Sequence, residues 1–283
     1  MVELMDNPIG IVGYGIVGQA LEYGFKKEPI FIYDKFKDFL SLKEVCEKSE
    51  FIFVCVPTPF RADESGIDLS IVNEVVDEIS TYISGTDKIC VIKSTVIPGT
   101  TQEAAKRNPG VQFAFNPEFL TEANFLEDFV NSDRVVIGAN DDLVSRRLVS
   151  LYKKHFPKMP VFQTDPTTAE MVKYMANCYL ATKVMFANEM YDICQKLGIK
   201  YEEVKKLVVA DHRIFDSHLD VTTNRGFGGK CFPKDMIALK GFADELGVET
   251  EVMDAVWRKN LKIRKVKDWE EIPFVVSENS KEE

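Results

Sequence analysis

A cysteine at position 231 lies in the stretch GFGGKCFPKD, residues 226–235, whose residue types and spacing suit a nucleophilic thiol. A pair of glycines just before it allows a sharp turn, and a proline two residues after it fits the first turn of a helix. The helix dipole and two flanking ammonium groups, Lys230 and Lys234, would favour a thiolate. We therefore predict that Cys231 lies just before a helix and acts as a nucleophile. The alternative is a small thiol buried in the core.

A second motif, GYGIVG at residues 13–18, follows the apolar segment IGIV and opens a helical segment. In that context the first glycine makes the turn, the second lets the backbone approach a pyrophosphate, and the third packs helix against strand. The next apolar segment ends at Asp34, whose carboxylate would accept hydrogen bonds from ribose hydroxyls and favour NAD over NADP. Lys35 keeps NADP open, because a cation tolerates a 2′-phosphate. The alternative is a glycine turn in an unrelated α/β protein.

Apolar strand segments continue to alternate with helical ones as far as about residue 166. This pattern predicts an α/β fold with an N-terminal Rossmann-type, doubly wound parallel sheet, which binds ligands outside the carboxyl ends of its strands. Four polar residues fall at those expected ends: Thr58, Thr95, Asn116 and Glu118.

From Thr167 the sequence runs for about 30 residues without glycine or proline, which predicts one long helix with apolar residues on nearly all sides. Such a helix is expected to be buried between domains or between subunits. Lys173 and Asn177 are four residues apart and share a face, where they could serve a site or be solvated.

Further helical segments are expected at 201–209, 234–246 and 250–266, which would form a small all-α second domain. The predicted organisation is a NAD-binding Rossmann domain over 1–166, a connecting helix over 167–198, a helical domain over 199–268 and a loose tail over 269–283.

Composition narrows the class of protein further. A content of 45% hydrophobic residues over 283 positions supports a soluble globular protein, and the net charge of −10 argues against a nucleic-acid partner. No apolar run is long enough to span a bilayer, and the N-terminus does not resemble a secretory signal. The six cysteines form no CxxC pair, so we expect free thiols in the cytoplasm, no disulfide framework and no metal site.

Several longer motifs occur in a fixed order along the chain: VPTP at 56–59, KSTVIPGT at 93–100, NPEFLTEANFLEDFVNSDRVVIG at 116–138, AEMVKYMANCYLATKVMFANE at 169–189 and DHRIF at 211–215. Together with the glycine turn and the cysteine stretch, they make the chain resemble the UDP-glucose/GDP-mannose dehydrogenase family over nearly all of its length. Enzymes of this family oxidise a sugar C6 alcohol to a carboxylate in two steps with two NAD molecules, for polysaccharide biosynthesis. The resemblance therefore implies NAD as cofactor and a nucleotide sugar, most simply UDP-glucose, as substrate.

The resemblance also assigns roles to individual residues. Cys231 would form a thiohemiacetal and then a thioester, Lys173 would stabilise the oxyanion, and Asp235 would position water or share a proton. Asn177 would donate to the oxyanion, and Glu118 with Thr95 would assist thioester hydrolysis. The implied cofactor-binding residues are Gly13, Gly15, Ile16, Val17, Gly18, Asp34, Lys35, Val56, Thr58, Pro59, Thr95 and Glu122. The implied substrate-binding residues are Glu118, Phe119, Leu120, Lys173, Asn177, Arg213, Gly226, Phe227 and Gly228. Purely structural roles for Glu118 and Glu122 stay open.

The apolar long helix leads us to predict a homodimer around it, and the resemblance implies that Arg213 could reach a neighbouring subunit. Family members also carry a C-terminal Rossmann-like domain, and the sequence is expected to stop short of it. A basic segment, RKNLKIRK at 258–265, could meet a diphosphate or be a solvated helix face. Two alternative functions stay open: a two-domain β-hydroxyacid dehydrogenase acting on a small acid, and a non-catalytic NAD-binding subunit.

Overall fold

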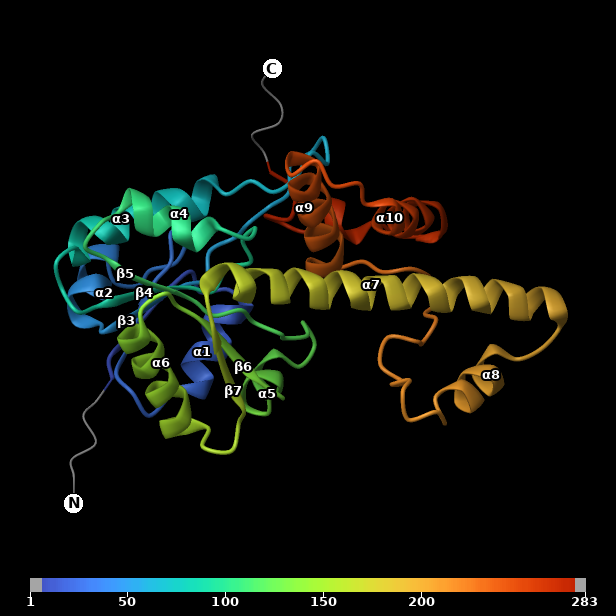
Figure 1. The fold of residues 1–283 in the computed structure, drawn as a ribbon, viewed down its shortest axis with the longest axis horizontal. Coiled ribbons are helices and arrows are strands. Elements are labelled where there is room, and N and C mark those ends of the chain that lie inside the picture. Colours follow the sequence, from blue (N-terminus) through green and yellow to red (C-terminus); the bar gives the residue numbers. More distant parts are fainter. Residues whose placement is uncertain (1–6, 278–283) are drawn as a thin grey trace. The chain divides into compact units, whose positions relative to one another are not determined.

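The computed structural model describes residues 7–277 and divides them into two compact units (Figure 1). The first unit comprises the described residues up to Thr58 together with Asp68–Lys173, and the second comprises Pro59–Ile67 together with the described residues from Tyr174 onward. The division falls inside the long helix α7 (Pro166–Leu197), so one continuous helix contributes to both units.

The first unit is built on one seven-stranded sheet with the order β2-β1-β3-β4-β5-β6-β7. Its strands are β1 (Ile9–Val12), β2 (Ile30–Tyr33), β3 (Phe51–Val54), β4 (Ile89–Ile92), β5 (Gln112–Phe115), β6 (Val135–Gly138) and β7 (Val161–Thr164). The central strands β1, β3 and β4 are buried along their whole length, as their unbroken apolar sequences require in a sheet covered on both faces. The predicted fold class is confirmed.

The prediction of a wholly parallel sheet is wrong at one edge. Strand β6 pairs with β5 in the antiparallel direction, through Phe115 and Gly138, and β7 runs parallel to β6. The connection from β5 to β6 contains only the short helix α5 (Phe125–Val130), and it joins the carboxyl end of β5 to β6 without crossing the length of the sheet. A parallel strand would need a connection that returns to the opposite ends of the strands, so β6 runs antiparallel to β5.

Helices cover both faces of the sheet (Figure 1). Helices α1 (Ile16–Gly24), α5 and α6 (Asp142–His155) pack on one face, where Leu21, Phe129 and Leu148 share a buried apolar cluster with strand residues. Helices α2 (Leu42–Lys48), α3 (Ser70–Ile83) and α4 (Thr100–Arg107) contribute to the cluster on the other face. The two clusters hold the carboxyl ends of β1, β3, β4 and β5 along a common edge.

The second unit is helical, as predicted. Besides the later part of α7 it contains α8 (Tyr201–Val208), α9 (Cys231–Glu245), α10 (Glu251–Ile263) and the 3-10 helix η1 (Asp268–Glu270). Helix α9 begins three residues earlier than expected, so Cys231 is its first residue and does not precede it. Pro233 permits this early start, because the first-turn N–H groups of a helix have no partner within the helix.

The prediction of a loose tail is wrong for residues 269–277. The side chain of Trp269 is 2% exposed, and its ring centroid lies 5.6 Å from that of Trp257. The N–H of Phe60 donates to the carbonyl of Val275 at 2.9 Å, and the N–H of Ser277 donates to the carbonyl of Phe60 at 2.7 Å. Burial of a large aromatic side chain outweighs the polar character of the segment. Residues 278–283 lie outside the described part.

Candidate active site

The glycine turn between β1 and α1 has the geometry of a phosphate-binding turn. Gly13 has φ +95°, and a Cβ there would lie 2.8 Å from the carbonyl oxygen of Cys55. A Cβ on Gly18 would lie 2.4 Å from the carbonyl oxygen of Gly13, so α1 can approach the strand only without a side chain. A Cβ on Gly15, in contrast, would have no atom within 4 Å. The open space beside Gly15, at the N-terminus of α1, fits a pyrophosphate.

Asp34 follows β2 and supports this turn. Its carboxylate accepts the N–H of Tyr14 at 2.8 Å and the N–H of Phe36 at 3.0 Å. The cation beside the glycine turn is Lys37, which was not among the predicted site residues. Its ammonium donates to the carbonyl of Tyr14 at 2.6 Å and lies 5.0 Å from the centroid of the Tyr14 ring. Lys35, the predicted cation beside Asp34, is exposed.

Substitution of Gly15 and of Gly13 should affect different properties, namely NAD affinity and stability. We expect Gly15→Ala to keep the thermal stability of the wild type and to weaken NAD binding at least tenfold, because its methyl group would stand where phosphate must approach. We expect Gly13→Ala to lower the free energy of unfolding by about 2 kcal/mol, because its backbone is left-handed. Calorimetric titration with NAD and thermal unfolding measure the two effects. Loss of stability in Gly15→Ala without loss of NAD affinity would contradict this assignment.

Other predicted cofactor residues lie beyond neighbouring strands of the same sheet. Thr58 follows β3 and Thr95 follows β4, and both side chains are buried. The carbonyl of Val56 accepts the hydroxyl of Ser94 at 2.7 Å, which ties these two strand ends together. Pro59 begins the segment 59–67, which belongs to the second unit.

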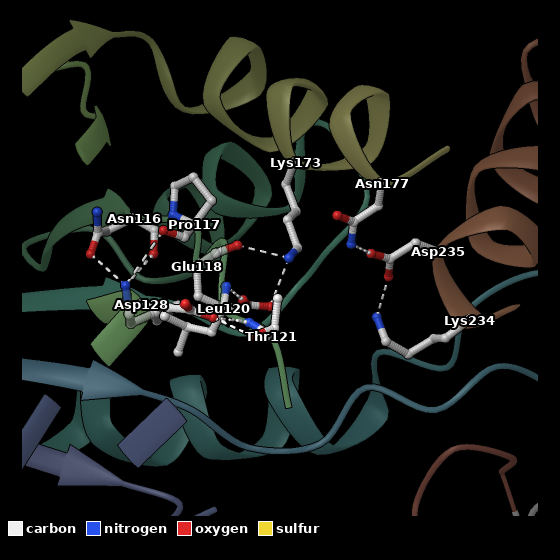
Figure 2. A network of polar contacts seen from close by, with 11 residues as sticks. Asn116, Pro117, Glu118, Leu120, Thr121, Asp128, Lys173, Asn177, Lys234 and Asp235 are labelled. Atoms are coloured by element: carbon white, nitrogen blue, oxygen red, sulfur yellow. Dashed lines mark hydrogen bonds and ion pairs between the residues drawn. The ribbon is translucent and has the colours of Figure 1, made fainter. Parts of the chain in front are cut away.

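Glu118 and Lys173 form a buried ion pair within the first unit (Figure 2). The Lys173 ammonium donates to the Glu118 carbonyl and to its Oε1, both at 2.7 Å, while the N–H of Leu120 donates to Oε2 at 2.8 Å. Only 3% of the Lys173 side chain and 9% of the Glu118 side chain are exposed. Burial raises the pKa of Glu118, but the ion pair and the hydrogen bonds more than offset this, so its pKa lies below the usual value.

A second buried cation, Lys93, was missed by sequence reasoning as a site residue. Its ammonium donates to Asn116 Oδ1 at 2.8 Å and to the Asn116 carbonyl at 3.2 Å, and the hydroxyl of Tyr152 donates to the same Oδ1 at 2.5 Å. Burial lowers the pKa of Lys93 to about 8. A lysine that ends a buried apolar strand, as in VIK at 91–93, was the available signal. Lys93 thus fixes the backbone immediately before Glu118.

Phe119, Leu120 and Glu122 follow on the same loop. The guanidinium of Arg134 lies 4.1 Å from the ring centroid of Phe119, and the Lys173 ammonium lies 5.7 Å from it. The side chain of Glu122 is exposed. Two cationic side chains, those of Arg134 and Lys173, therefore lie close to the Phe119 ring, which directly follows Glu118 in the chain.

In the second unit, Cys231 is the first residue of α9 and is exposed. The other five cysteines, all within residues 7–277, are buried or half-buried, and none of the six forms a disulfide. Burial raises the pKa of Cys46 and of Cys55 to about 12, which keeps those thiols protonated and inert. Exposure at a helix N-terminus sets Cys231 apart from them.

Asp235 lies one turn further along α9 and is 1% exposed. Its Oδ2 accepts the side-chain amide of Asn177 at 2.5 Å, and its Oδ1 accepts the ammonium of Lys234 at 2.5 Å (Figure 2). Lys234, one of the two lysines expected to favour a thiolate, thus forms a short ion pair with Asp235. Arg213 is exposed and forms an ion pair with Asp211 two residues before it.

Within residues 7–277, no group of three or more His, Cys, Asp or Glu side chains could hold a metal ion. None of the helices in that range is long and apolar enough to cross a membrane.

The glycine turn, the acidic end of β2 and the open N-terminus of α1 define the first unit as a dinucleotide-binding domain of the Rossmann type. Residues 32–156 match the model of the UDP-glucose/GDP-mannose dehydrogenase family, NAD binding domain, and residues 167–262 match that of its central domain. The chain belongs to the UDP-glucose/GDP-mannose dehydrogenase family, and its first unit contains the NAD-binding domain.

Individual relatives agree with this placement. A UDP-glucose 6-dehydrogenase from Rickettsia bellii is 38% identical over 237 residues, which cover 80% of this chain and 52% of the relative. The solved structure of a UDP-glucose dehydrogenase from Pyrobaculum islandicum superposes with a TM-score of 0.83 at 29% identity, covering 93% of this chain and 69% of that one. The chain thus spans about half the length of the curated relatives it matches.

A 3-hydroxyisobutyrate dehydrogenase from Mycobacterium tuberculosis shares the fold more distantly. Its structure superposes with a TM-score of 0.69 at 14% identity, covering 91% of this chain and 94% of that one. At this identity the likeness concerns the fold alone.

Proposed function

We propose that the chain carries out the NAD-dependent oxidation of a nucleotide-sugar C6 alcohol to a carboxylate, with UDP-glucose as substrate and UDP-glucuronate as product. The observation that carries the proposal is Cys231, the one exposed cysteine, at the first residue of α9 in a family whose first domain binds NAD. A single alcohol oxidation needs no nucleophile, whereas oxidation of an aldehyde to an acid is eased by a covalent thiol adduct.

In this proposal, NAD held at the glycine turn would supply the hydride acceptor for each oxidation, and the proton of the C6 hydroxyl group passes to water. Lys173 donates a hydrogen bond to the C6 oxygen as negative charge develops there, which requires its ion pair with Glu118 to rearrange when substrate binds. The Cys231 thiolate adds to the aldehyde carbon and gives a thiohemiacetal, whose oxidation gives a thioester. Glu118, with Thr95, accepts a proton from the water that hydrolyses the thioester and releases the thiol.

Asp235 and Asn177 form a second pair of proposed catalytic residues, which lies in the second unit. Their hydrogen bond, at 2.5 Å, aligns the Asn177 amide, which we assign as a donor to the oxyanion, with the Asp235 carboxylate, which positions water. Phe119, Leu120, Arg213 and the loop at Gly226–Gly228 are proposed to bind the substrate. The product, a nucleotide-linked sugar acid, is a suitable donor for polysaccharide synthesis.

A panel of nucleotide sugars supplied with NAD tests the function. We expect two NADH for each molecule of UDP-glucose consumed, with the acid as final product by mass spectrometry. One NADH for each small hydroxy acid, and none with nucleotide sugars, would instead identify a β-hydroxyacid dehydrogenase. NAD binding with no turnover of any substrate would identify a non-catalytic subunit.

A homodimer through α7 belongs to the same proposal. Four large apolar side chains of α7 are exposed at intervals of four or seven residues, namely Met175, Tyr179, Phe186 and Ile193, with exposed fractions of 67%, 63%, 59% and 50%. Positions four and seven apart lie on one face of a helix, so they form a continuous apolar stripe. An exposed stripe of this length on the predicted buried helix is best covered by the same stripe of a second copy, in a two-fold arrangement.

We expect Tyr179→Glu to convert a dimer into a monomer, because two carboxylates would face each other across the two-fold axis. Light scattering after gel filtration measures the mass. Phe162→Glu, which alters an exposed aromatic residue on β7, is the matched control and should leave the mass of the dimer unchanged. A monomeric wild type at micromolar concentration would reject the dimer.

A further inference from the structure

The basic segment of α10 and the residues after it support the loop that leads to Cys231. The side chain of Arg264 is 9% exposed; its guanidinium donates to the carbonyl of Arg225 at 3.0 Å and contacts Asp268 at 3.2 Å. For Arg264, neither the diphosphate-binding nor the solvated-face interpretation holds, because its donors serve the protein itself. Lys259 lies 3.8 Å from Asp192 and is likewise engaged within the unit.

Asn260 is the buried centre of this arrangement, with none of its surface exposed. Its Oδ1 accepts the N–H of Phe227 at 2.9 Å, and its Nδ2 donates to the carbonyl of the same residue at 3.0 Å. One side-chain amide thus satisfies both polar groups of a buried backbone unit. Aspartate keeps only the acceptor when ionised, and an apolar residue keeps neither.

The glycine loop is held at either side of Phe227 as well. The N–H of Gly226 donates to Asn188 Oδ1 at 3.2 Å, and the N–H of Gly229 donates to Asp268 Oδ2 at 3.2 Å. Arg225, a residue with a side chain, has φ +58°, a conformation that costs energy and persists only where the surroundings impose it. The loop is therefore set by its partners and not by its own preference.

The glycine loop packs against α10 and η1 so closely that no side chain fits at Gly226 or Gly228. A Cβ on Gly226 would lie 2.2 Å from Asn260 Oδ1, and a Cβ on Gly228 would lie 2.2 Å from Asp268 Oδ1. Asn260 therefore needs glycine opposite it in order to reach the backbone of Phe227. The glycines at 226 and 228 are thus explained by contact with Asn260 of α10 and with Asp268 of η1, respectively.

Phe227 connects this clamp to the first turn of α9. Its ring packs edge-on against Phe232 with centroids 6.1 Å apart, and Phe232 directly follows the thiol-bearing residue. The Phe227 ring also packs against Trp257 of α10, with centroids 6.1 Å apart. A shift of Phe227 would therefore move the first turn of α9. The N-terminus of this helix would stabilise a thiolate at Cys231.

We infer that Asn260 is a positioning residue for the Cys231 thiol: by binding both backbone groups of Phe227 it fixes the glycine loop and holds Cys231 at the N-terminus of α9. This inference rests on the proposed role of Cys231 as nucleophile. Asn260 acts through the loop and does not contact the reacting atoms.

Alkylation of Cys231 by iodoacetamide tests this inference without any substrate, because Cys231 is the exposed cysteine. The rate is measured by mass spectrometry from pH 6 to pH 9 on the intact chain. For Asn260→Ala we expect the midpoint of the profile to rise by about half to one pH unit, because the thiol loses its place at the helix N-terminus. Lys262→Ala, an exposed change on α10, should give the wild-type profile.

Asn260→Asp provides a conservative variant should Asn260→Ala fail to fold. Its protonated carboxyl group can both donate and accept, so its alkylation rate relative to wild type should recover as the pH falls. A merely structural role would lower the unfolding temperature without moving the midpoint. Wild-type profiles for folded Asn260→Ala and Asn260→Asp would overturn the inference.

The two half-reactions give an independent readout on the whole enzyme. Oxidation of the alcohol does not use the thiol, whereas oxidation of the aldehyde does, so Asn260→Asp should slow the aldehyde step about tenfold more than the alcohol step. Equal slowing of both steps would count against a positioning role. If no nucleotide sugar were turned over, the proposed function would fail, and the alkylation profiles would still decide the role of Asn260.

Discussion

In the proposed reaction, replacement of Cys231 by alanine should lower the steady-state production of UDP-glucuronate at least 10³-fold, because the aldehyde can then no longer be held as a covalent adduct. The first oxidation does not need the thiol. A single turnover should therefore still give about one NADH and a sugar aldehyde, which a carbonyl-trapping reagent and mass spectrometry would detect. Cys231→Ser should behave similarly, because a hydroxyl is a much weaker acid than a thiol and therefore a much weaker nucleophile at neutral pH.

A matched variant at a second cysteine shows whether the loss of activity is specific to Cys231 or follows the removal of any thiol. Cys46 is buried in the first unit, on α2, and Cys46→Ala should keep the wild-type rate while losing about 1 kcal/mol of stability. Acid formation by Cys231→Ala at the wild-type rate, with two NADH for each sugar, would exclude covalent catalysis by this residue.

The second large effect concerns the buried pair of Glu118 and Lys173. Lys173→Met should abolish most activity and also lower the free energy of unfolding at pH 7 by about 3 kcal/mol, because it leaves a buried carboxylate without its cation. Lys173→Met combined with Glu118→Gln should recover most of the stability but none of the activity, since the amide stays neutral and still accepts the N–H of Leu120.

The pH dependence of stability follows from the direction of the pKa shift. In the wild type the folded-state pKa of Glu118 is lowered, so its contribution to stability is present above its unfolded pKa and is lost as the pH falls through the folded one. Without Lys173, burial raises the pKa of Glu118 instead. The stability deficit of Lys173→Met should therefore shrink as the pH is lowered from 7 toward 5.

Thermal unfolding of the variants over that pH range is the measurement. The exposed pair of Lys106 and Glu103 offers a control in the same unit, where Lys106→Met should change the free energy of unfolding by less than about 0.5 kcal/mol. A deficit of Lys173→Met that stays constant between pH 7 and pH 5 would show that the ionised carboxylate is not its cause.

Much of the fold could be predicted because its signals lie in short windows of sequence. The glycine turn needs left-handed backbone at Gly13 and a close approach at Gly18, and both demands are visible in six residues. The apolar periods of strands and of the long helix are equally local. The reversal of β6 and the packing of Trp269 were missed because chain direction and burial depend on partners distant in sequence.

The candidate site divides in the same way. The sequence by itself determined which groups are chemically capable: the thiol at 231, the acid that ends β2, the lysine and asparagine four residues apart on one helix, and the family in which these occur together. Each is recognisable because local backbone geometry and functional-group chemistry restrict the residue at that position.

Only the tertiary structure decided how those groups are held. Lys173 meets Glu118 across 55 positions, Lys93 meets Asn116 across 23, and Asn260 clamps Phe227 across 33. Hydrogen bonds and ion pairs between such distant residues leave no period in the sequence, because any polar residue at those positions looks solvated until the chain has buried it. Burial lowers the pKa of Lys93, whereas the buried ion pair with Lys173 outweighs burial and lowers the pKa of Glu118, so the electrostatics of the site belong to the fold.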